Sequence, residues 1–487
     1  MDGEQVDNGG VLDVVIMAAG KGTRMKSALP KVLHRLAGRA LLAHVMQCAA
    51  RLQPRRIVLV TGHGATEVEA AAAGYTLARS TFDIKSALQC VRQIPPQGTG
   101  HAVQQAVPWL GDDGMTLVLS GDVPLTEEST LRDLLKACQQ AGPGLALLTI
   151  HMDDPTGYGR VIRAGSSAAV DAPVRAIAEQ KDATPQELAV REIYSGIMAA
   201  PTRHLKQWLA QLDNRNAQGE YYLTDVVKFA VAQGMPVVAH QITDAVQVAG
   251  VNSPVQLAEL ERAYQSRLAR RFMEQGVRLA DPARFDVRGE LVCAGDVEID
   301  VNCVFEGSVS LGQGVRIGAN CVVANAQIAA GALVAPFTHI DGEAQGVTVG
   351  EGARIGPFAR LRPGTQLGAQ VHIGNFVEVK NSILAEGAKA NHLAYVGDAV
   401  LGERVNVGAG TITANYDGAN KHRTTIEADA HIGSNSVLVA PVTIGEGGTI
   451  GAGSVISKNT PPGALSVARG KQIHIANWQR PVKKKES

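Results

Sequence analysis

The stretch from residue 349 to residue 379, "VGEGARIGPFARLRPGTQLGAQVHIGNFVEV", places an aliphatic side chain at every sixth position. These aliphatic residues are Val349, Ile355, Leu361, Leu367, Ile373 and Val379. A short side chain stands two positions earlier, as at Ala353, Ala359 and Thr365, and glycine follows four of the six aliphatic residues. This period is typical of a hexapeptide β-helix, in which three short strands make one coil of a triangular prism. The aliphatic side chain fills the prism, the short one leaves it room, and glycine permits the corner.

The same period continues on both sides of this stretch. It recurs at Leu311, Ile317 and Val323, and again at Ile432, Leu438, Ile444, Ile450 and Ile456. Cys303 and Cys321 fall on the short position, one full coil apart, and we expect them to be small buried fillers. A prism cannot cover its own flat faces, so side-by-side packing of three copies, a homotrimer, is expected.

Two intervals depart from the period. The interval from Val379 to Leu401 is longer than three steps of six, and the interval from Val407 to Ile432 is longer than four. We therefore expect residues to leave the prism in both intervals, which contain "KANHLAYVGD" and "TITANYDGANKHRTT". Irregular backbone on a rigid scaffold is where function concentrates.

The first half of the chain has a different pattern. Four continuous apolar runs alternate with helical patterns: "VVIMAAG", "RIVLVTG", "TLVLSGDVPL" and "LALLTI". Runs of this kind indicate buried parallel strands. The pattern predicts a doubly wound α/β domain, whose ligands sit at the carboxyl ends of its strands.

The loop after the first run combines glycine with positive charge. Gly20 and Gly22 are followed by Arg24, Lys26 and Lys31. The spacing fits neither the dinucleotide fingerprint nor the ATPase phosphate loop. Free amides of a glycine-rich turn beside several cations favour a nucleoside triphosphate cradle, while a tight turn with a solvated basic face is the alternative.

Two polar side chains follow apolar runs and are candidate Mg²⁺ ligands. Asp122 lies in "SGD", and Asn252 ends "VAGVN". Mg²⁺ binds one or two such oxygens together with phosphate oxygens and water. The alternative for Asp122 is a helix cap.

Composition limits the class of protein. The 487 residues include 46 basic and 46 acidic side chains, which argues against nucleic-acid binding through a global basic field. The polar start "MDGEQVDNGG" is no signal peptide, and no apolar run is long enough to span a membrane. The six cysteines include no C-x-x-C pair and suggest reduced thiols in a cytoplasmic protein.

A helical arm is expected to join the two halves. Ser253 and Gln256 form a capping box around Pro254, and Gly276 can end the helix. The expected division is residues 1–252 for the first domain, 253–276 for the linker and 277–487 for the β-helix with its tail.

Several longer motifs together resemble the bacterial bifunctional N-acetylglucosamine-1-phosphate uridyltransferase and glucosamine-1-phosphate acetyltransferase family. They are "AAGKGTRM", "LPKVL", "PTGYGR", "NAQGEYYLTD", "IGPFARLRPG", "GNFVEVKNS", "NHLAYVGD" and "VGAGTITANYDGANKH". The resemblance runs from Val14 to the "RPVKKK" tail. It implies a Rossmann-like α/β nucleotidyltransferase domain followed by an all-β left-handed parallel β-helix. It also implies two reactions, acetyl transfer from acetyl-CoA to glucosamine 1-phosphate and uridylyl transfer from UTP with Mg²⁺. The product, UDP-N-acetylglucosamine, feeds cell-wall and lipid A synthesis.

The resemblance also implies residues for the uridyltransferase site. Lys31 would be the cation over the phosphates, Gln93, Gly98 and Thr99 would read uracil, and Asp122 and Asn252 would hold the metal. Gly159 and Glu179 match sugar contacts. The full set implied for UTP and UDP-N-acetylglucosamine is Ala18, Ala19, Gly20, Lys31, Gln93, Gly98, Thr99, Ser120, Gly121, Asp122, Gly159, Glu179, Tyr194 and Asn252.

A second set is implied for the acetyltransferase site. His392 matches the general base, although a lone loop histidine is otherwise most often a surface residue. Arg362 and Lys380 match the cations for the sugar phosphate. The remaining implied contacts are Tyr395 and Asn406 for the sugar, and Ala409, Asn415, Tyr416, Ser434, Ala452 and Arg469 for acetyl-CoA.

The chain departs from the family pattern at Tyr194, where the family usually has asparagine, and the stretch from Gly74 to Gln97 is longer than usual. Two other functions fit parts of the pattern. One is a nucleotidyltransferase whose β-helix only oligomerises or senses an effector, and the other is a non-catalytic scaffold.

Overall fold

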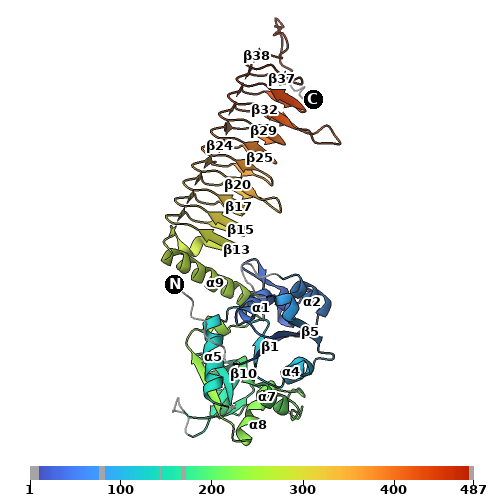
Figure 1. Cartoon of the computed structure of the whole chain (residues 1–487), viewed down its shortest axis with the longest axis vertical. Coiled ribbons are helices and arrows are strands. Elements are labelled where there is room, and N and C mark those ends of the chain that lie inside the picture. The colour runs from blue at the N-terminus through green and yellow to red at the C-terminus, as the bar shows by residue number, and fades with distance from the viewer. Residues whose placement is uncertain (1–9, 76–82, 143, 166–171, 482–487) are drawn as a thin grey trace, which may run out of the picture. The chain divides into compact units, whose positions relative to one another are not determined.

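The computed structural model describes residues 10–75, 83–142, 144–165 and 172–481. The chain divides into two compact units between Tyr264 and Gln265 (Figure 1). Among the described helices, none combines the length and the apolar character that crossing a membrane requires.

The first unit is built on one nine-stranded sheet. Its path of hydrogen-bonded neighbours is β11-β7-β10-β6-β1-β4-β5, and β8 and β9 extend from β10. The strands are β1 (Leu12–Ala18), β4 (Arg56–Thr61), β5 (Leu88–Arg92), β6 (Met115–Ser120), β7 (Leu145–His151), β8 (Gly159–Arg163), β9 (Val174–Ala178), β10 (Glu192–Pro201) and β11 (Val237–Ile242). A two-stranded hairpin, β2 (Arg35–Leu36) and β3 (Arg39–Ala40), lies apart from this sheet.

Helices pack on both faces of the sheet, as the doubly wound prediction requires. Along β1, Val14 and Ile16 join one apolar cluster and Val15 joins the other, because successive side chains of a strand point to opposite faces. The first cluster includes residues of α1, α2 and α5, and the second includes residues of α4, α7 and α8. The helices are α1 (Leu41–Arg51), α2 (Ala65–Ala73), α3 (Ile84–Ala87), α4 (Thr99–Ala106), α5 (Glu128–Gln140), α6 (Pro185–Leu188), α7 (Thr202–Leu209) and α8 (Val226–Ala232).

Three of the four apolar runs form adjacent parallel strands, and the fourth, β7, is separated from them by one antiparallel strand and pairs in parallel with β11. β1 pairs in parallel with β4 and β6, whereas β10 lies between β6 and β7 and is antiparallel to both. β10 is not among the strands predicted from the apolar runs. Its register with β7 shifts between Tyr194 and Met198, and this irregularity obscures the strand pattern.

Helix α9 (Pro254–Glu274) contains the division between the two units. At its start, Gln256 N donates to Ser253 Oγ over 3.3 Å, and Asn252 N donates to Gln256 Oε1 over 2.8 Å. The first hydrogen bond satisfies an amide that a helix start leaves free, whereas the second is accepted from the residue before Ser253, so the reciprocal bond of the predicted capping box is displaced by one residue. Leu257 and Leu260 pack with a small apolar cluster of the first unit.

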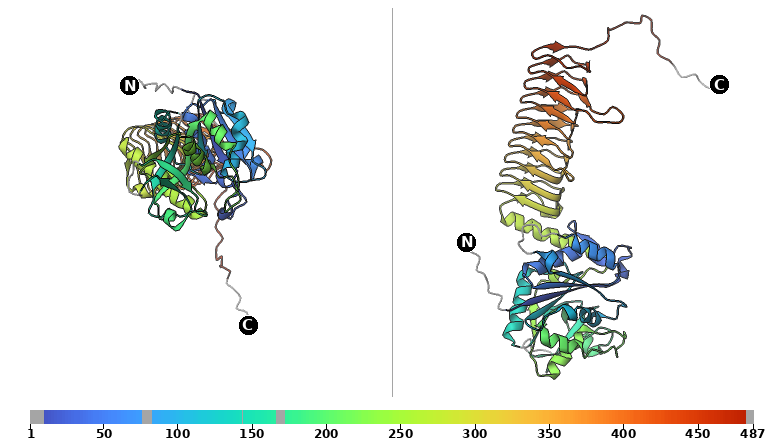
Figure 2. Two further views of the ribbon diagram at one scale, coloured as in Figure 1. Left: turned by 90° about the horizontal axis from the view of Figure 1, so that it is seen from below. Right: turned by 45° about the vertical axis from the view of Figure 1, so that its right-hand side comes forward.

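The second unit is a three-sided parallel β-helix (Figure 2). One face holds β12 (Arg278–Leu279), β14 (Glu298–Ile299), β16 (Arg316–Ile317), β18 (Leu333–Val334), β21 (Arg354–Ile355), β24 (His372–Asn375), β27 (Lys389–His392), β30 (Asn406–Val407), β33 (His431–Ile432), β36 (Thr449–Ile450) and β38 (Leu465–Ser466). The other strands are β13 (Phe285–Cys293), β15 (Cys303–Leu311), β17 (Val322–Ile328), β19 (His339–Asp341), β20 (Val347–Val349), β22 (Arg360–Leu361), β23 (Gln366–Leu367), β25 (Glu378–Lys380), β26 (Ile383–Leu384), β28 (Tyr395–Gly397), β29 (Ala399–Leu401), β31 (Ile412–Ala414), β32 (Thr424–Ile426), β34 (Val437–Val439), β35 (Val442–Ile444) and β37 (Val455–Ile456).

The prism interior follows the predicted period. All six aliphatic residues between Val349 and Val379 are buried, and so are Cys303 and Cys321. Burial raises the pKa of the Cys303 thiol to about 12, so this cysteine is an unreactive filler near neutral pH.

The prediction that residues leave the prism between Val379 and Leu401 is wrong. The buried residues continue through Leu384, Ala390 and Val396, in steps of five, six, six and five. Each coil here is one residue shorter than three steps of six, since Lys389 pairs with His372 and Val400 with Ile383. Two corners are each one residue shorter than usual, and the backbone stays in the prism.

The second interval does contain an insertion. Thr424 pairs with Ala399, and the spacing between these paired residues is well beyond the three steps of six in a regular coil. The additional residues, 415–423, form a loop between β31 and β32. Within this loop Tyr416 and Lys421 make an antiparallel bridge. A smaller extra loop, residues 342–346, separates β19 from β20 and was not predicted.

Candidate active sites

The glycine-rich loop begins where β1 ends. Ala18 and Ala19 are buried, and Gly20 has open space where a side chain would stand. Gly22 is left-handed, with φ of +59°, and a Cβ there would lie 2.6 Å from Lys31 Cβ. The loop therefore closes onto Lys31 only because residue 22 has no side chain.

The Pro30–Lys31 pair is held in place by the next strand-to-helix turn. Pro30 is buried against Gly64, whose φ is +64°, and a Cβ on Gly64 would overlap the proline ring. Lys31 then begins the short 3-10 helix Lys31–Leu33. Pro30 has a fixed φ, so this packing sets the direction from which the Lys31 side chain leaves.

Lys31, Asp122 and Asn252 meet at one point in the first unit. Lys31 Nζ donates to Asp122 Oδ2 and, over 3.1 Å, to Asn252 Oδ1. Asp122 follows β6, and the Val251 amide donates to its carbonyl over 3.0 Å, which brings the chain before Asn252 alongside. The Lys31 and Asp122 side chains are only 14% and 18% exposed, so water screens the pair weakly.

These oxygens fit the expected Mg²⁺. A carboxylate and an amide oxygen already converge on one cation, the Lys31 ammonium, and hard oxygens are the ligands that Mg²⁺ takes. Within the described residues no group of three His, Cys, Asp or Glu side chains could hold a metal ion. A metal here would therefore complete its shell with phosphate oxygens and water.

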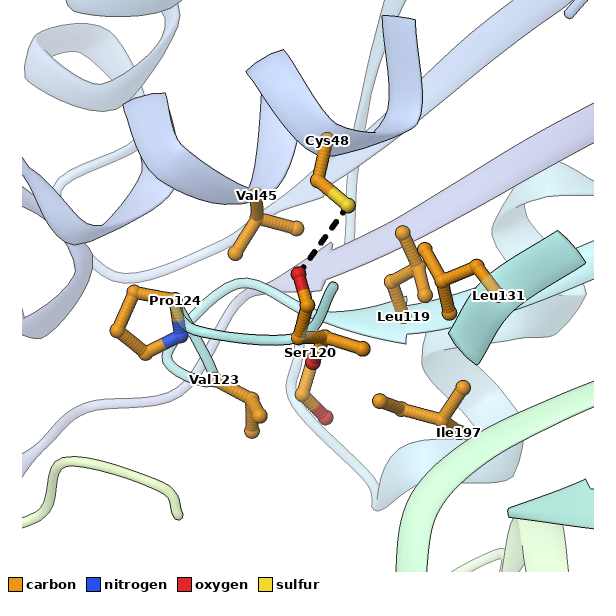
Figure 3. A pocket seen from close by; sticks show the side chains of 9 residues that line it. Val45, Cys48, Leu119, Ser120, Val123, Pro124, Leu131 and Ile197 are labelled. Atoms are coloured by element: carbon orange, nitrogen blue, oxygen red, sulfur yellow. Dashed lines mark hydrogen bonds between the residues drawn. The ribbon is translucent and has the colours of Figure 1, made fainter. Parts of the chain in front are cut away.

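Ser120 and Gly121 form the turn between β6 and Asp122. The Gly121 amide donates to the Met17 carbonyl over 2.9 Å, which ties this turn to the end of β1. Behind the turn is a small apolar cavity lined by Val45, Cys48, Leu119, Ser120, Val123, Pro124, Thr126, Leu131 and Ile197 (Figure 3). Burial raises the pKa of Cys48 to about 12, and neither Lys31 nor Asn252 lines this cavity, so it is not the candidate site.

Gln93, Gly98 and Thr99 lie close together beyond β5. Gln93 is buried, and its Nε2 donates to the Gly98 carbonyl over 2.9 Å. Thr99 begins α4 and its hydroxyl accepts from the Leu223 amide over 3.2 Å. The Gln93 amide thus has a fixed orientation, as reading a base requires.

Gly159, Glu179 and Tyr194 gather around β8 and β10. Tyr194 pairs with Gly159, and a Cβ on Gly159 would lie 3.8 Å from Glu179 Oε1. Burial raises the pKa of Glu179, and the hydrogen bond that Thr224 donates over 2.8 Å opposes this rise. Tyr194 is 7% exposed and packs in the second apolar cluster, so its ring lies in the core in this structure.

In the second unit, cations gather at one corner of the prism. Arg362 Nη1 donates to Glu378 Oε1 over 2.8 Å, and Lys380 ends the adjacent strand β25. The close approach of Lys421 lowers the pKa of Lys380, with burial and Arg362 acting in the same direction. Lys421 comes from the 415–423 loop and was missed, although the long interval before Ile432 pointed to that loop. Three cations near one corner suit a phosphate ligand.

His392 ends β27 at a different corner. Its Nδ1 donates to Asn375 Oδ1 over 2.9 Å. An amide oxygen only accepts hydrogen bonds, so the proton is on Nδ1 and Nε2 has a free lone pair. This arrangement suits a general base, and Asn375 was also missed by the sequence analysis.

The expected acetyl-CoA residues continue from His392 along its own corner. Backbone hydrogen bonds join His392 to Gly410, Ala409 to Asn435 and Ser434 to Gly453, coil after coil. Ala452 lies in this column, and a Cβ on Gly453 would be 3.8 Å from Arg469 Cδ. Four expected contacts, Ala409, Ser434, Ala452 and Arg469, thus follow one line.

Of the other expected contacts, Asn415, Tyr395 and Tyr416 lie in or beside the 415–423 loop, and Asn406 lies apart from it. Asn415 is buried, and its amide donates to the Asp398 carboxylate, which also accepts from Asn381 over 2.5 Å. Tyr395 lies near, with its hydroxyl 3.5 Å from Asn415 Nδ2. Tyr416 is exposed on the loop. Asn406 lies on β30, level with Lys389 of the coil before.

Known proteins match both units. A profile of the MobA-like NTP transferase domain matches residues 14–216, and one of the bacterial transferase hexapeptide (six repeats) matches residues 346–381 and 423–458. Together with the parallel coils, these matches confirm the predicted fold class, a Rossmann-like domain followed by a left-handed β-helix.

Curated relatives match nearly the whole chain. "Bifunctional protein GlmU" of Polaromonas sp. strain JS666 is 73% identical over 97% of this chain and 98% of its own length. The proteins of the same name from Polaromonas naphthalenivorans and Albidiferax ferrireducens are 73% and 69% identical, each over 97% of this chain and over 98% and 100% of their own lengths. Among solved structures, a UDP-glucose pyrophosphorylase complexed with UDP-glucose covers 53% of this chain and 99% of its own, with 17% identity and a TM-score of 0.44.

Proposed function

The chain belongs to the family of bifunctional GlmU proteins, and we propose which of its residues carry out the two reactions. It is a bifunctional enzyme that acetylates glucosamine 1-phosphate and then joins the product to UMP from UTP, releasing pyrophosphate. This identity confirms the resemblance seen in the sequence and excludes the two rival functions. We assign uridylyl transfer to residues 1–252 and acetyl transfer to residues 277–487.

The convergence of Lys31, Asp122 and Asn252 carries the proposal for uridylyl transfer. Asp122 and Asn252 would hold Mg²⁺, which neutralises phosphate charge when bound. Lys31 then turns from these oxygens to the triphosphate, and the loop from Ala18 to Gly20 offers backbone amides to it. Phosphoryl transfer depends mainly on positioning and charge neutralisation, which these groups supply.

For the other parts of that substrate, we assign Gln93, Gly98 and Thr99 to the uracil. Ser120 and Gly121 support the phosphate end beside Asp122, and Gly159 and Glu179 form the sugar end, with the Tyr194 ring packed behind them in the core. The fixed orientation of the Gln93 amide supports the base assignment, and the contact between Gly159 and the Glu179 carboxylate supports assigning these two residues together.

For acetyl transfer, we assign His392 as the general base. Its free Nε2 takes a proton from the amine of glucosamine 1-phosphate as the nitrogen attacks the thioester carbon. The C–N bond forms, the C–S bond breaks, and CoA leaves as its thiolate. Arg362, Lys380 and Lys421 bind the sugar phosphate, with Tyr395 and Asn406 on the sugar. The contacts proposed for acetyl-CoA are Ala409, Asn415, Tyr416, Ser434, Ala452 and Arg469.

The direct test is incubation with glucosamine 1-phosphate, acetyl-CoA, UTP and Mg²⁺, followed by mass analysis. The expected products are UDP-N-acetylglucosamine, CoA and pyrophosphate. Omitting Mg²⁺ should stop pyrophosphate release and leave CoA release unchanged. CoA release without a nucleotide sugar in the complete mixture would refute the uridyltransferase assignment.

We also propose that the enzyme is a homotrimer. Phe337, Phe358 and Phe376 stack along one corner at 5.0 and 5.3 Å between ring centroids, yet are 51%, 47% and 56% exposed. Contiguous apolar surface of this kind favours a protein contact. His392 and the cation corner also lie at opposite ends of β25 and β28, about 16 Å apart for five residue steps. A second copy beside the first would bring the two kinds of corner together.

Mixed trimers test this arrangement. A His392→Ala chain and a Lys380→Ala chain, refolded together, should regain acetyl transfer, because these residues lie at the two different corners and about a quarter of the heterologous contacts join two intact residues. If one chain supplies both residues, the mixture should be no more active than either parent. Uridylyl transfer in every sample is the control for folding.

We place the enzyme in the cytoplasm. All six cysteines are free in the structure, and reduced thiols are usual in that compartment. The measurement is cell fractionation.

A further inference from the structure

One buried hydroxyl of the uridyltransferase unit has no function in the assignments above. Within the described residues, the Tyr194 hydroxyl has no hydrogen-bond partner, and it is shielded from water. Burying an unsatisfied hydroxyl typically costs about 1–3 kcal/mol. A phenylalanine would pack in the same cluster without this cost, so packing alone does not explain why the side chain has a hydroxyl.

The strand register places this hydroxyl on the side of Glu179. Tyr194 and Gly159 are directly opposite across β10 and β8, and opposite residues present their side chains to the same face. The missing Cβ of Gly159 would lie 2.7 Å from Ile177 Cγ2 and 3.8 Å from Glu179 Oε1. Ile177 therefore fills the space beside Gly159, the Glu179 carboxylate lies in contact at its edge, and Tyr194 is near enough to Glu179 for that charge to raise its pKa.

The surroundings of Glu179 oppose its charge. Thr224 of the 3-10 helix Leu223–Asp225 donates to Oε1 over 2.8 Å. Burial raises the pKa of Glu179, and the nearby carboxylates of Asp225, Asp182 and Glu220 raise it further. Burial also raises the pKa of Tyr194 well above its ordinary value, with Glu179 adding to the rise, so the phenol keeps its proton. A protonated phenol can donate a charge-assisted hydrogen bond to a nearby carboxylate, so the Tyr194 hydroxyl and Glu179 are complementary.

We propose that Tyr194 is a positioning residue: in the ligand-bound enzyme its hydroxyl donates to the Glu179 carboxylate and holds it ionised and aimed at the N–H and O–H donors of the sugar phosphate. The inference rests on the assignment of Glu179 to the sugar end. Tyr194 acts from the core and does not itself touch the sugar. It should therefore change recognition of the sugar and leave UTP recognition alone.

The test compares Tyr194→Phe with the unaltered enzyme in the full-length chain. The variant keeps the ring and removes only the hydroxyl. The dissociation constant of UDP-N-acetylglucosamine should rise about tenfold at neutral pH, the low end for a hydrogen bond to a charged group. The dissociation constant of UTP should stay within about twofold. Tyr75→Phe, which removes a hydroxyl packed against the other cluster, is the matched control and should change neither.

The pH profile separates positioning from packing. Binding should weaken as pH falls and Glu179 becomes protonated, and Tyr194→Phe should move this acid limb to higher pH because the ionised form has lost a donor. Glu179→Gln cannot titrate there, so the limb should disappear, and adding Tyr194→Phe to it should cost little more.

Three results would overturn the inference. They are unchanged UDP-N-acetylglucosamine binding in Tyr194→Phe, equal weakening of UTP and UDP-N-acetylglucosamine, and additive effects of Tyr194→Phe and Glu179→Gln. If Tyr194→Phe does not fold, retention of the acid limb in Glu179→Gln refutes the proposal by itself. Failure of the proposed function looks different, since the unaltered enzyme would then release no pyrophosphate.

Discussion

Replacing Asp122 with alanine should separate the two activities of this enzyme. Asp122 is the charged member of the pair of oxygens that meet at Lys31. The variant lacks the carboxylate proposed for Mg²⁺, while the β-helix that carries the acetyltransferase residues is a separate compact unit. We expect uridylyl transfer to collapse and acetyl transfer to continue.

The size of each effect follows from the contacts. Lys31 and Asp122 are 14% and 18% exposed, so losing this charged hydrogen bond should destabilise the first unit by about 2 kcal/mol. A bound metal contributes several kcal/mol to charge stabilisation in the transition state. At about 1.4 kcal/mol per factor of ten, a loss of about 4 kcal/mol lowers kcat by roughly a thousandfold.

The assay measures pyrophosphate and CoA release from the same preparation, with calorimetry for UTP binding. Asp133→Ala is the matched control, because Asp133 is an exposed carboxylate on α5 that pairs with Lys136 over 3.5 Å. Asp122→Asn keeps an oxygen ligand without its charge, so its rate of pyrophosphate release should lie between those of Asp122→Ala and Asp133→Ala. Equal loss of both activities in folded Asp122→Ala, or no loss of pyrophosphate release, would refute the assignment.

Two further changes test the cradle and the cation corner. Gly64→Ala should raise the KM for UTP severalfold, because the added methyl group would displace Pro30. The control is Gly142→Ala: Gly142 is also left-handed but has open space around it, so this variant should lower the stability of the fold without changing the KM for UTP. Equal KM values in the two variants would show that Pro30 does not guide Lys31. Lys421→Ala should weaken glucosamine 1-phosphate binding about tenfold. In the unaltered enzyme, the affinity for glucosamine 1-phosphate should fall as pH rises through the lowered pKa of Lys380. In Lys421→Ala this loss of affinity should occur at higher pH, because the group that lowers the pKa of Lys380 is gone. Binding titrations that show the loss at the same pH in both proteins would contradict the contact between Lys380 and Lys421.

The residues that could be predicted are those whose position follows from a local period. Asp122 follows the parallel strand β6, and such strands bring their carboxyl ends to one edge of a sheet, so its approach to Lys31 is within reach of the sequence. Asn252 follows no strand: it comes after the 3-10 helix Ala245–Val248, and the Val251 amide holds this stretch beside Asp122. The antiparallel strand β10 could not be predicted either, because its register breaks after Tyr194 and the pairing of distant strands decides its place.

The β-helix shows the same limit in another form. The interval from Val379 to Leu401 can hold three ordinary steps and an insertion, or four steps of which two are short. The sequence period cannot distinguish them, but burial of Leu384, Ala390 and Val396 shows the second. His392, the general base implied by the resemblance, therefore lies at an ordinary corner of the prism and not in a loop insertion.

That position changes the argument for His392. A corner residue of a rigid coil has a fixed backbone, and the hydrogen bond from Nδ1 to Asn375 on the coil before fixes the ring as well. The same coils repeat the corner above it, so a long, narrow ligand can lie along Ala409, Ser434 and Ala452 with its end at His392. The 415–423 loop with Lys421 lies at the other corner. In the proposed assignment, the prism therefore provides the general base and the binding surface for acetyl-CoA, and the inserted loop provides positive charge for the sugar phosphate.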